Sequence, residues 1–198
     1  GVVIGSIIVS DPDAGESFTH ILGGVDGSAF DVVNGKLVTK APLNFEQKSS
    51  YQFELVAIDQ GGLPFTKNFT IAVSNVNEPS TNIVLSNNTV IENSAIGTVV
   101  GVLSTTDEDI GSTFNYSLAG SDAVNFEVLN GTIRTKSVFN FESKKSYFVI
   151  VISLDQAGQI FSKPVTIQIT NANEPPTDVL LSISSVDENM IAGTVVGS

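Results

Sequence analysis

Residues 126–142 read FEVLNGTIRTKSVFNFE, and residues 30–46 read FDVVNGKLVTKAPLNFE. In both stretches short runs rich in apolar and β-branched residues lie on either side of an Asn-Gly pair. That pair is typical of a tight primed turn between antiparallel strands, because both central residues of the turn need positive φ. Each stretch therefore predicts a β-hairpin, with strands at 126–129 and 132–135 in the later copy.

The similarity extends outward from this hairpin over the whole chain. Residues 1–96 align with residues 97–192 without a gap, and residues 193–198 begin a third copy. Roughly two positions in five are identical, which is far above chance for so long a register. We expect a window on a longer tandem array, with repeats at 1–77 (lacking its first strand), 78–173 (complete) and 174–198 (the start of a third).

The complete repeat carries alternating apolar and polar residues rich in Val, Ile, Phe and Thr, and it shows no sustained helical period. Seven strands are expected, at residues 83–91, 98–105, 113–118, 126–129, 132–135, 147–154 and 160–170. A further strand is expected at 179–186 in the third copy. Seven short antiparallel strands in a unit of this size predict an all-β fold of tandem seven-stranded Greek-key β-sandwiches with immunoglobulin-like architecture.

Composition excludes several classes of function. The net charge of −12 argues against a nucleic-acid partner, which needs a basic face. There is no long apolar run, so no membrane insertion is expected in this segment. The absence of cysteine excludes disulfides, thiolate zinc sites and cysteine nucleophiles. An acidic, cysteine-free repeat of this kind is typical of exported surface proteins, so we expect an extracellular or cell-surface location.

Many of the 21 acidic residues recur with the repeat, whereas acidity serving solubility alone would be scattered. They gather after the first and second strands, in an Asn-Phe-Glu tripeptide, after a long strand, and in an Asn-x-Asn-Glu-Pro linker. Calcium takes six to eight hard oxygen ligands from carboxylates, amides and backbone carbonyls. The pattern therefore favours Ca²⁺ as the cofactor.

At these residues the chain resembles the cadherin superfamily, in particular its bacterial-type cadherin-like tandem repeats. The matching pieces, in order, are Glu-Asn, Gly-Thr-Val-Val-Gly, an Asp-x-Asp-x-Gly loop, Phe-x-x-x-Asn-Gly, Asn-Phe-Glu, Tyr-(x)7-Asp and the linker. The resemblance covers the whole chain and implies cadherin-like sandwiches with calcium at the junction between successive repeats. It also implies adhesion or structural spacing, in a cell-surface or fibre protein.

The resemblance implies ligands for three junctions. The junction inside this chain would use Glu46, Asn75, Asn77, Glu78, Asp107, Asp109 and Asp155. The next junction would use Glu92, Glu142, Asn171, Asn173 and Glu174. An upstream junction would use Asp11, Asp13 and Asp59. The chain departs from the family at Asn75 and Asn171, where the family's linker has Asp, and fewer carboxylates predict weaker or fewer calcium ions.

Other interpretations stay open at this point. The acidic residues could be turn residues that bond the local backbone. The chain could be a filament subunit assembled by strand donation between chains, or a carbohydrate-binding or enzyme-appended module. No catalytic constellation is found, so no enzyme activity is expected. Expected partners are neighbouring repeats, copies of the same chain, or surface glycans, and four Asn residues match the N-glycosylation pattern: Asn68, Asn87, Asn115 and Asn130.

Overall fold

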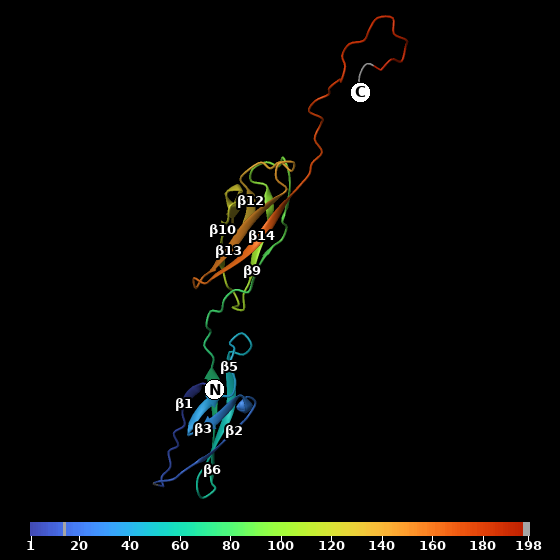
Figure 1. The fold of residues 1–198 in the computed structure, drawn as a ribbon. Coiled ribbons are helices and arrows are strands. Elements are labelled where there is room, and N and C mark those ends of the chain that lie inside the picture. The colour runs from blue at the N-terminus through green and yellow to red at the C-terminus, as the bar shows by residue number, and fades with distance from the viewer. Residues whose placement is uncertain (14, 196–198) are drawn as a thin grey trace. The chain divides into compact units, whose positions relative to one another are not determined.

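The structure is a computed structural model that describes residues 1–13 and 15–195 (Figure 1). These residues form β-strands and two short 3-10 turns, Gly27–Ala29 and Ala123–Asn125, and no α-helix occurs among them. The all-β prediction is confirmed. No helix in the described ranges is long and apolar enough to cross a membrane. The last residues of the predicted third repeat, 196–198, lie outside the described residues.

The chain divides into two compact units. The first contains residues 1–84, 104–116 and 152–163, and the second contains residues 85–103, 117–151 and 164–198. The division passes through several strands of the second repeat, so that the linker and the adjoining loops of that repeat belong to the first unit. The repeat boundaries at 77/78 and 173/174 therefore stay a prediction from the sequence.

The second repeat is built from two four-stranded sheets, ordered β10-β13-β14-β8 and β11-β12-β9-β7. The bounds of its strands are β7 Asn82–Leu85, β8 Thr89–Ile91, β9 Val99–Thr106, β10 Phe114–Ala119, β11 Phe126–Leu129, β12 Thr132–Thr135, β13 Ser146–Asp155 and β14 Ile160–Thr170. The side chains that alternate inward from the two sheets form its core, which includes Ile83, Val100, Ile133, Val149 and Ile167, all at most 1% exposed.

The first repeat contains two three-stranded sheets, ordered β1-β4-β3 and β2-β5-β6. The bounds of its strands are β1 Val3–Ser6, β2 Thr19–Gly23, β3 Phe30–Val33, β4 Lys36–Thr39, β5 Ser50–Ile58 and β6 Pro64–Ala72. Its core is aromatic: the rings of Phe30 and Phe53 are 5.0 Å apart, and Phe69 stacks on Phe53 at 5.7 Å. The outer edges of β1 and β6 have no neighbouring strand in the described structure.

Both Asn-Gly hairpins are confirmed. Asn34 and Gly35 have φ of 51° and 70°, and Asn130 and Gly131 have φ of 50° and 70°. Around the later turn, β11 pairs with β12 antiparallel from Leu129 opposite Thr132 outward. Asparagine and glycine tolerate this left-handed region better than other residues, which is why the turn could be located from the sequence.

Two strand predictions were wrong. The expected strand at 83–91 is two strands, because the chain leaves one sheet after Leu85 and joins the other at Thr89, where β8 pairs with β14 in parallel. The Asn87 side chain holds this crossing by donating hydrogen bonds to the carbonyl oxygens of Thr89 and Val100 at 2.9 and 2.7 Å. This parallel pair also corrects the expectation that all strands are antiparallel.

The second error concerns the strand expected at 179–186. Residues 171–195 contain no strand, and Val179 and Leu181 are 86% and 69% exposed. Burial between two sheets stabilises the matching segment of the second repeat, whereas the described residues place no sheet against residues 179–186. Apolar alternation predicts a strand only where a partner sheet is present.

Candidate calcium centres

Three groups of carboxylates have oxygen atoms within 4.8 Å of one another: Glu46, Glu78 and Asp109; Glu92, Glu142 and Glu174; and Asp11, Glu16 and Asp59. Each group contains at least two of the residues predicted for one junction. The first group and its surrounding loops lie in the first compact unit, the second group lies in the second unit, and the third lies in the first.

A turn in each repeat presents the Glu of the Asn-Phe-Glu tripeptide. The Asn44 side chain accepts a hydrogen bond from the Gln47 amide at 2.7 Å, and Asn140 accepts one from the Ser143 amide at 2.6 Å. The asparagine therefore closes the turn through its side-chain oxygen. This local bond fixes the backbone from which Glu46 projects toward the linker residue Glu78.

The centre of the first group is Asp109, which is 7% exposed. Its two carboxylate oxygens accept hydrogen bonds from the Asn75 side chain at 2.8 Å and from the Glu78 amide at 2.9 Å. Asn77 donates from its side chain to Asp155 at 2.8 Å and accepts at its carbonyl from Gln159 at 2.8 Å. The linker of the first repeat and two loops of the second are thus joined within the first compact unit.

Two predicted ligands in this set are already engaged in turns. Asp107 accepts hydrogen bonds from the Ser80 hydroxyl at 2.7 Å and from the Asp109 amide at 3.0 Å. Asp155, at 4% exposure, accepts from the amides of Ala157 and Gln159 at 2.8 Å each. Local turn bonds therefore account for part of the role of both residues, for Asp155 as well as for Asp107. These bonds do not account for Glu46 and Glu78.

The negative charges of the first group repel one another. Glu78 Oε2 is buried and has no hydrogen-bond partner among the described residues. Burial raises the pKa of Glu78, and the negative charges of Glu46, Asp109 and Glu108 raise it further. A buried carboxylate oxygen surrounded by other carboxylates lacks a positive partner. Hard anionic oxygens in this arrangement fit a calcium ion chemically.

The second group is organised around Glu92, which is 2% exposed. Its oxygens accept hydrogen bonds from the amides of Phe141 and Ala172 at 2.7 and 2.8 Å. These two backbone bonds lower the pKa of Glu92. Glu92 is thus held as a carboxylate between two loops of its repeat.

The other two members of the second group, Glu142 and Glu174, are exposed, and each accepts a hydrogen bond from an asparagine side chain. Asn171 donates to Glu142 at 2.9 Å, and Asn93 donates to Glu174 at 2.6 Å. Asn173, the remaining predicted ligand, is exposed on the linker. Asn93 was not among the predicted site residues, although it follows Glu92 directly in the Glu-Asn motif.

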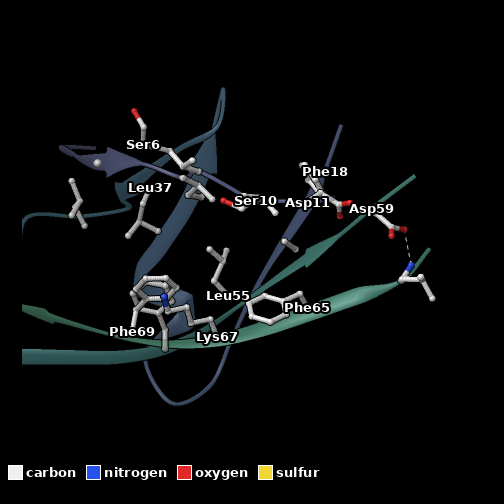
Figure 2. A pocket seen from close by; sticks show the side chains of 18 of the residues that line it. Ser6, Ser10, Asp11, Phe18, Leu37, Leu55, Asp59, Phe65, Lys67 and Phe69 are labelled. Carbon is white, nitrogen blue, oxygen red and sulfur yellow. Dashed lines mark hydrogen bonds between the residues drawn. The ribbon is translucent and has the colours of Figure 1, made fainter. Parts of the chain in front are cut away.

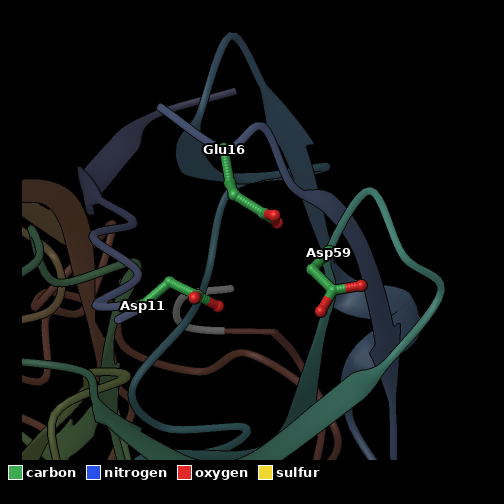
Figure 3. Close-up of side chains that lie close together, drawn as sticks. All are labelled: Asp11, Glu16 and Asp59. Carbon is green, nitrogen blue, oxygen red and sulfur yellow. The ribbon is translucent and has the colours of Figure 1, made fainter. Parts of the chain in front are cut away.

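The third group differs from its prediction. The carboxylates of Asp11, Glu16 and Asp59 face a common space (Figure 3). Asp13 is exposed and outside this group, and its amide donates to Asp11 at 2.9 Å. The sequence reasoning missed Glu16 because it searched for recurring acids, and the matching position in the second repeat is Ser112.

Lysine does not neutralise these groups in the described residues. The two ion pairs found there, Lys48 with Asp26 and Lys144 with Asp122, lie outside all three groups. The three groups therefore keep their negative charge, apart from what amide and hydroxyl donors offset.

The four glycosylation candidates fall on different kinds of backbone. The Asn87 side chain is committed to the strand crossing described above, and Asn130 has the positive φ of the hairpin turn. Asn68 lies on β6 and is exposed, and Asn115 lies on β10 and is also exposed. Glycosylation at these positions stays a prediction.

Comparison with known proteins identifies relatives of the whole chain, although no family model matches it. The chain is 31% identical over 212 residues to the Fat-like cadherin-related tumor suppressor homolog of Drosophila melanogaster, covering 95% of this chain and 4% of that protein. It is 27% identical over 223 residues to human Cadherin-12, covering 99% of this chain and 28% of that protein. The chain thus spans less than a third of the length of these curated relatives.

Solved structures agree with this relationship. A protocadherin gammaB7 EC3-6 cis-dimer structure matches with a TM-score of 0.63 and 25% identity over 82% of this chain and 42% of that one. Human Protocadherin-24 EC1-2 matches with a TM-score of 0.67 over 83% of this chain and 87% of that one, and at 18% identity it supports the fold alone.

The matching relatives are cadherins and protocadherins, and the similar solved structures include extracellular cadherin domains of protocadherins. The bacterial-type assignment stays a prediction. Relatives, fold and recurring motifs agree, and the chain belongs to the cadherin superfamily.

Proposed function

We propose that this chain is a calcium-stiffened extracellular segment that acts in adhesion or as a spacer of a cell-surface or fibre protein. The observation that carries the proposal is the Glu78 carboxylate, whose buried Oε2 has no hydrogen-bond donor among the residues that the structure describes and lies with Glu46 and Asp109. These three residues come from the first repeat, the linker and the second repeat. A divalent cation there would bind all three segments at once.

The residues that would hold calcium in the internal junction are Glu46, Glu78 and Asp109, with Asn75, Asn77, Asp107 and Asp155 around them. A bound ion would supply the positive charge that the carboxylates lack. Glu92, Glu142 and Glu174 would serve the next junction together with Asn93, Asn171 and Asn173. Asp11, Glu16 and Asp59 would serve the upstream one, with Asp13 nearby.

The asparagine residues of the linker change the donor set of the junction. The Asn75 amide donates to Asp109 at 2.8 Å, a bond that an aspartate at this position could not make. The loss of a carboxylate weakens calcium binding, because ligand charge tunes affinity. We therefore expect a calcium affinity below that of a junction with an acidic linker residue.

A calcium ion would stiffen the linker because it would bind the linker only in its ordered form. A ligand that binds only the ordered form stabilises that form by mass action. Pro79, at the end of the Asn-x-Asn-Glu-Pro motif, restricts the linker further by fixing its own φ and disfavouring helix before it. An array of such junctions would hold successive repeats extended and present other parts of the protein at a distance.

Small-angle X-ray scattering of this chain, in chelator and then in millimolar calcium, tests the proposal. We expect a larger maximum dimension and a more rod-like profile in calcium, together with a higher Tm. An unchanged profile and an unchanged Tm would contradict a calcium role, and the acids would then be turn residues only.

The variant Glu78→Gln distinguishes calcium binding at this site from the general effect of removing one negative charge. In chelator we expect this variant to have a higher Tm than the wild type, because it removes a buried charge whose pKa is raised by burial and by neighbouring carboxylates. In calcium we expect it to lose most of the rise in Tm. The matched control is Glu127→Gln, at an exposed position of β11 outside all three groups. Equal responses of the two variants to calcium would contradict the assignment of the site.

A further inference from the structure

The strand β13 has apolar side chains on both of its faces within the second compact unit. Its inward residues include Val149 and Val151, which are fully buried in the core. Because side chains alternate along a strand, Phe148 and Ile150 point to the outer face of the sheet. Phe148 is 47% exposed, so an aromatic ring lies at the surface of this sheet.

The first repeat has polar residues at the same two positions. By the 96-residue offset, Phe148 matches Gln52 and Ile150 matches Glu54. These two residues lie on β5, which is the central strand of its sheet, as β13 is flanked by strands on both sides in its own sheet. The same sheet therefore forms with polar residues at these positions, and the fold does not require the apolar pair.

The inner side of the matching sheet in the first repeat is apolar (Figure 2). Leu37, Leu55 and Phe69 line an open groove of about 790 Å³ there. Glu54 precedes Leu55 on β5 and therefore points to the opposite, outer side, which Gln52 shares. The first repeat thus combines an apolar interior with a polar outer face, as expected for a sheet with one face in solvent.

The strands on either side of β13 carry small residues on the outer face of the second repeat. In the register of the first repeat, the residue that matches Ile150 faces the positions of Ala119 on β10 and Pro164 on β14. The next outward residue on β14 is Thr166. Because these neighbours are short, Phe148 and Ile150 form a raised ridge with a shallow groove beside it.

This outer face is also uncharged. Within the second compact unit, the described outward positions of β10, β13, β14 and β8 hold only Ser, Ala, Phe, Ile, Pro, Thr and Gln residues. The other sheet of that unit differs, because its Glu127 lies opposite Arg134. The chain has a net charge of −12, so two copies repel each other least where an uncharged face meets an uncharged face.

We propose that the outer face around Phe148 and Ile150 binds the same face of a second copy of this chain. The ridge of each copy enters the groove over Ala119 of the other, with the two sheets about 10 Å apart. Each copy presents the same patch, so the contact has two-fold symmetry and association stops at the dimer. The inference rests on the adhesion role proposed above and names a partner for it.

The size of the face predicts a weak dimer. Four strands spaced about 4.8 Å apart make a face only about 15 Å wide. Interfaces of this size belong to weak, transient complexes. The dimer therefore forms at high protein concentration and dissociates on dilution.

Sedimentation equilibrium of the chain in chelator tests the contact. The protein is made without N-glycans, because a glycan at Asn115 on β10 would crowd the face. Over about 10 µM to 1 mM the average mass should rise and level off at twice the mass of the chain. Raising the salt from about 0.05 M to 0.5 M should strengthen association, because screening reduces the repulsion between two acidic copies. A contact held together by opposite charges would weaken instead.

The double variant Phe148→Gln, Ile150→Glu places the residues of the first repeat on the ridge. We expect an unchanged circular dichroism spectrum and a dissociation constant at least about tenfold higher. The matched control is Leu129→Asp, which also replaces an exposed apolar residue and also adds one negative charge, but on the other sheet of the same unit. This control should dimerise as the wild type does.

Ala119→Gln keeps the test valid if the double variant fails to fold. This change fills the groove without altering charge or ridge, and it should also weaken the dimer at least about tenfold. Two-fold symmetry is tested by titrating a fluorescent trace of the double variant with unlabelled wild type. The mixed pair should be weaker than the wild-type dimer, because each copy contributes its ridge. Wild-type affinity in the mixed pair would overturn the two-fold contact.

Three further outcomes would overturn the proposal. The first is a chain that stays monomeric up to about 1 mM, and the second is association that both face variants leave unchanged. The third is a mass that continues to rise beyond the dimer. A failure of the calcium response would leave these measurements in chelator unchanged. A monomeric chain with a normal rise of Tm in calcium would overturn this contact and leave the calcium proposal intact.

Discussion

At the scale of single residues, each repeat has one aspartate that accepts hydrogen bonds from a lysine side chain and from a backbone amide. Asp122 accepts a hydrogen bond from Lys144 Nζ at 2.6 Å and another from the Phe148 amide at 2.8 Å. Asp26 in the first repeat accepts from Lys48 and from the Gln52 amide in the same way. Because the partners recur with the repeat, this contact belongs to the fold and not to a ligand site.

These contacts predict a dependence of stability on pH. The bond from Lys144, followed by that from the Phe148 amide, lowers the pKa of Asp122. The unfolded chain therefore binds the proton more readily, so the stabilisation is present above the ordinary pKa of an aspartate and is lost as the pH falls below it. We expect Asp122→Asn to reduce the slope of unfolding free energy against pH in this range, measured by urea unfolding.

Glu127→Gln serves as the control, because Glu127 lies exposed on β11 and makes neither of these contacts. The acid slope of the wild type should be retained in this control. An Asp122→Asn variant with the same slope as the wild type would show that the Lys144 contact does not contribute to acid stability.

At the scale of elements, segment 82–91 covers the core of the second repeat, and in the described residues no segment covers the matching part of the first. In the second repeat it covers the core, and Ile133 beneath it is fully buried. In the first repeat the matching residue, Leu37, lines the open groove and is 8% exposed. The same position in the hairpin is therefore packed on all sides in one repeat and bordered by open space in the other.

This difference predicts unequal costs for the same kind of truncation. Ile133→Ala should reduce the unfolding free energy of its repeat by about 2–5 kcal/mol, because it leaves a cavity that the two sheets cannot close. Leu37→Ala should cost less than about 2 kcal/mol, because its site already borders a groove that can adjust. Scanning calorimetry should show the larger drop in Tm for Ile133→Ala, at least about 8 °C.

The comparison is made in chelator, so that calcium binding does not contribute to the measured stability. Equal drops in Tm for the two variants would mean that the groove of the first repeat is closed in solution.

At the scale of the whole molecule, the charge of −12 is concentrated in recurring positions. Clustered carboxylates repel one another, and monovalent salt screens this repulsion over a Debye length of about 10 Å at 0.1 M. Screening acts on all the charges, whereas an ion held by Glu46, Glu78 and Asp109 acts at one site.

Sodium chloride and calcium should therefore increase the Tm of the chain by different amounts. In chelator, raising the salt from about 0.05 M to 0.5 M should increase Tm only modestly, because it screens without bridging. Millimolar calcium should increase Tm more and should do so again in the presence of the higher salt. Thermal scans at both salt levels measure this, and a calcium effect that disappears at high salt would indicate screening alone.

The sequence by itself determined the repeat, the sandwich class and the places of the hairpins. It could do so because these features depend on local properties, namely period-two alternation and the left-handed conformation that Asn130 and Gly131 tolerate. It also indicated most of the carboxylates that the structure brings together, since recurring acids at strand ends are a pattern along the chain.

Only the tertiary structure decided which of these residues meet. Glu46 and Asp109 are brought together by the fold, and Glu16 joins Asp11 without any recurring signal. The parallel pairing of β8 with β14 also depended on a partner distant in sequence. Apolar alternation records that a strand can form, but the available sheet edge determines whether it does and on which side it pairs.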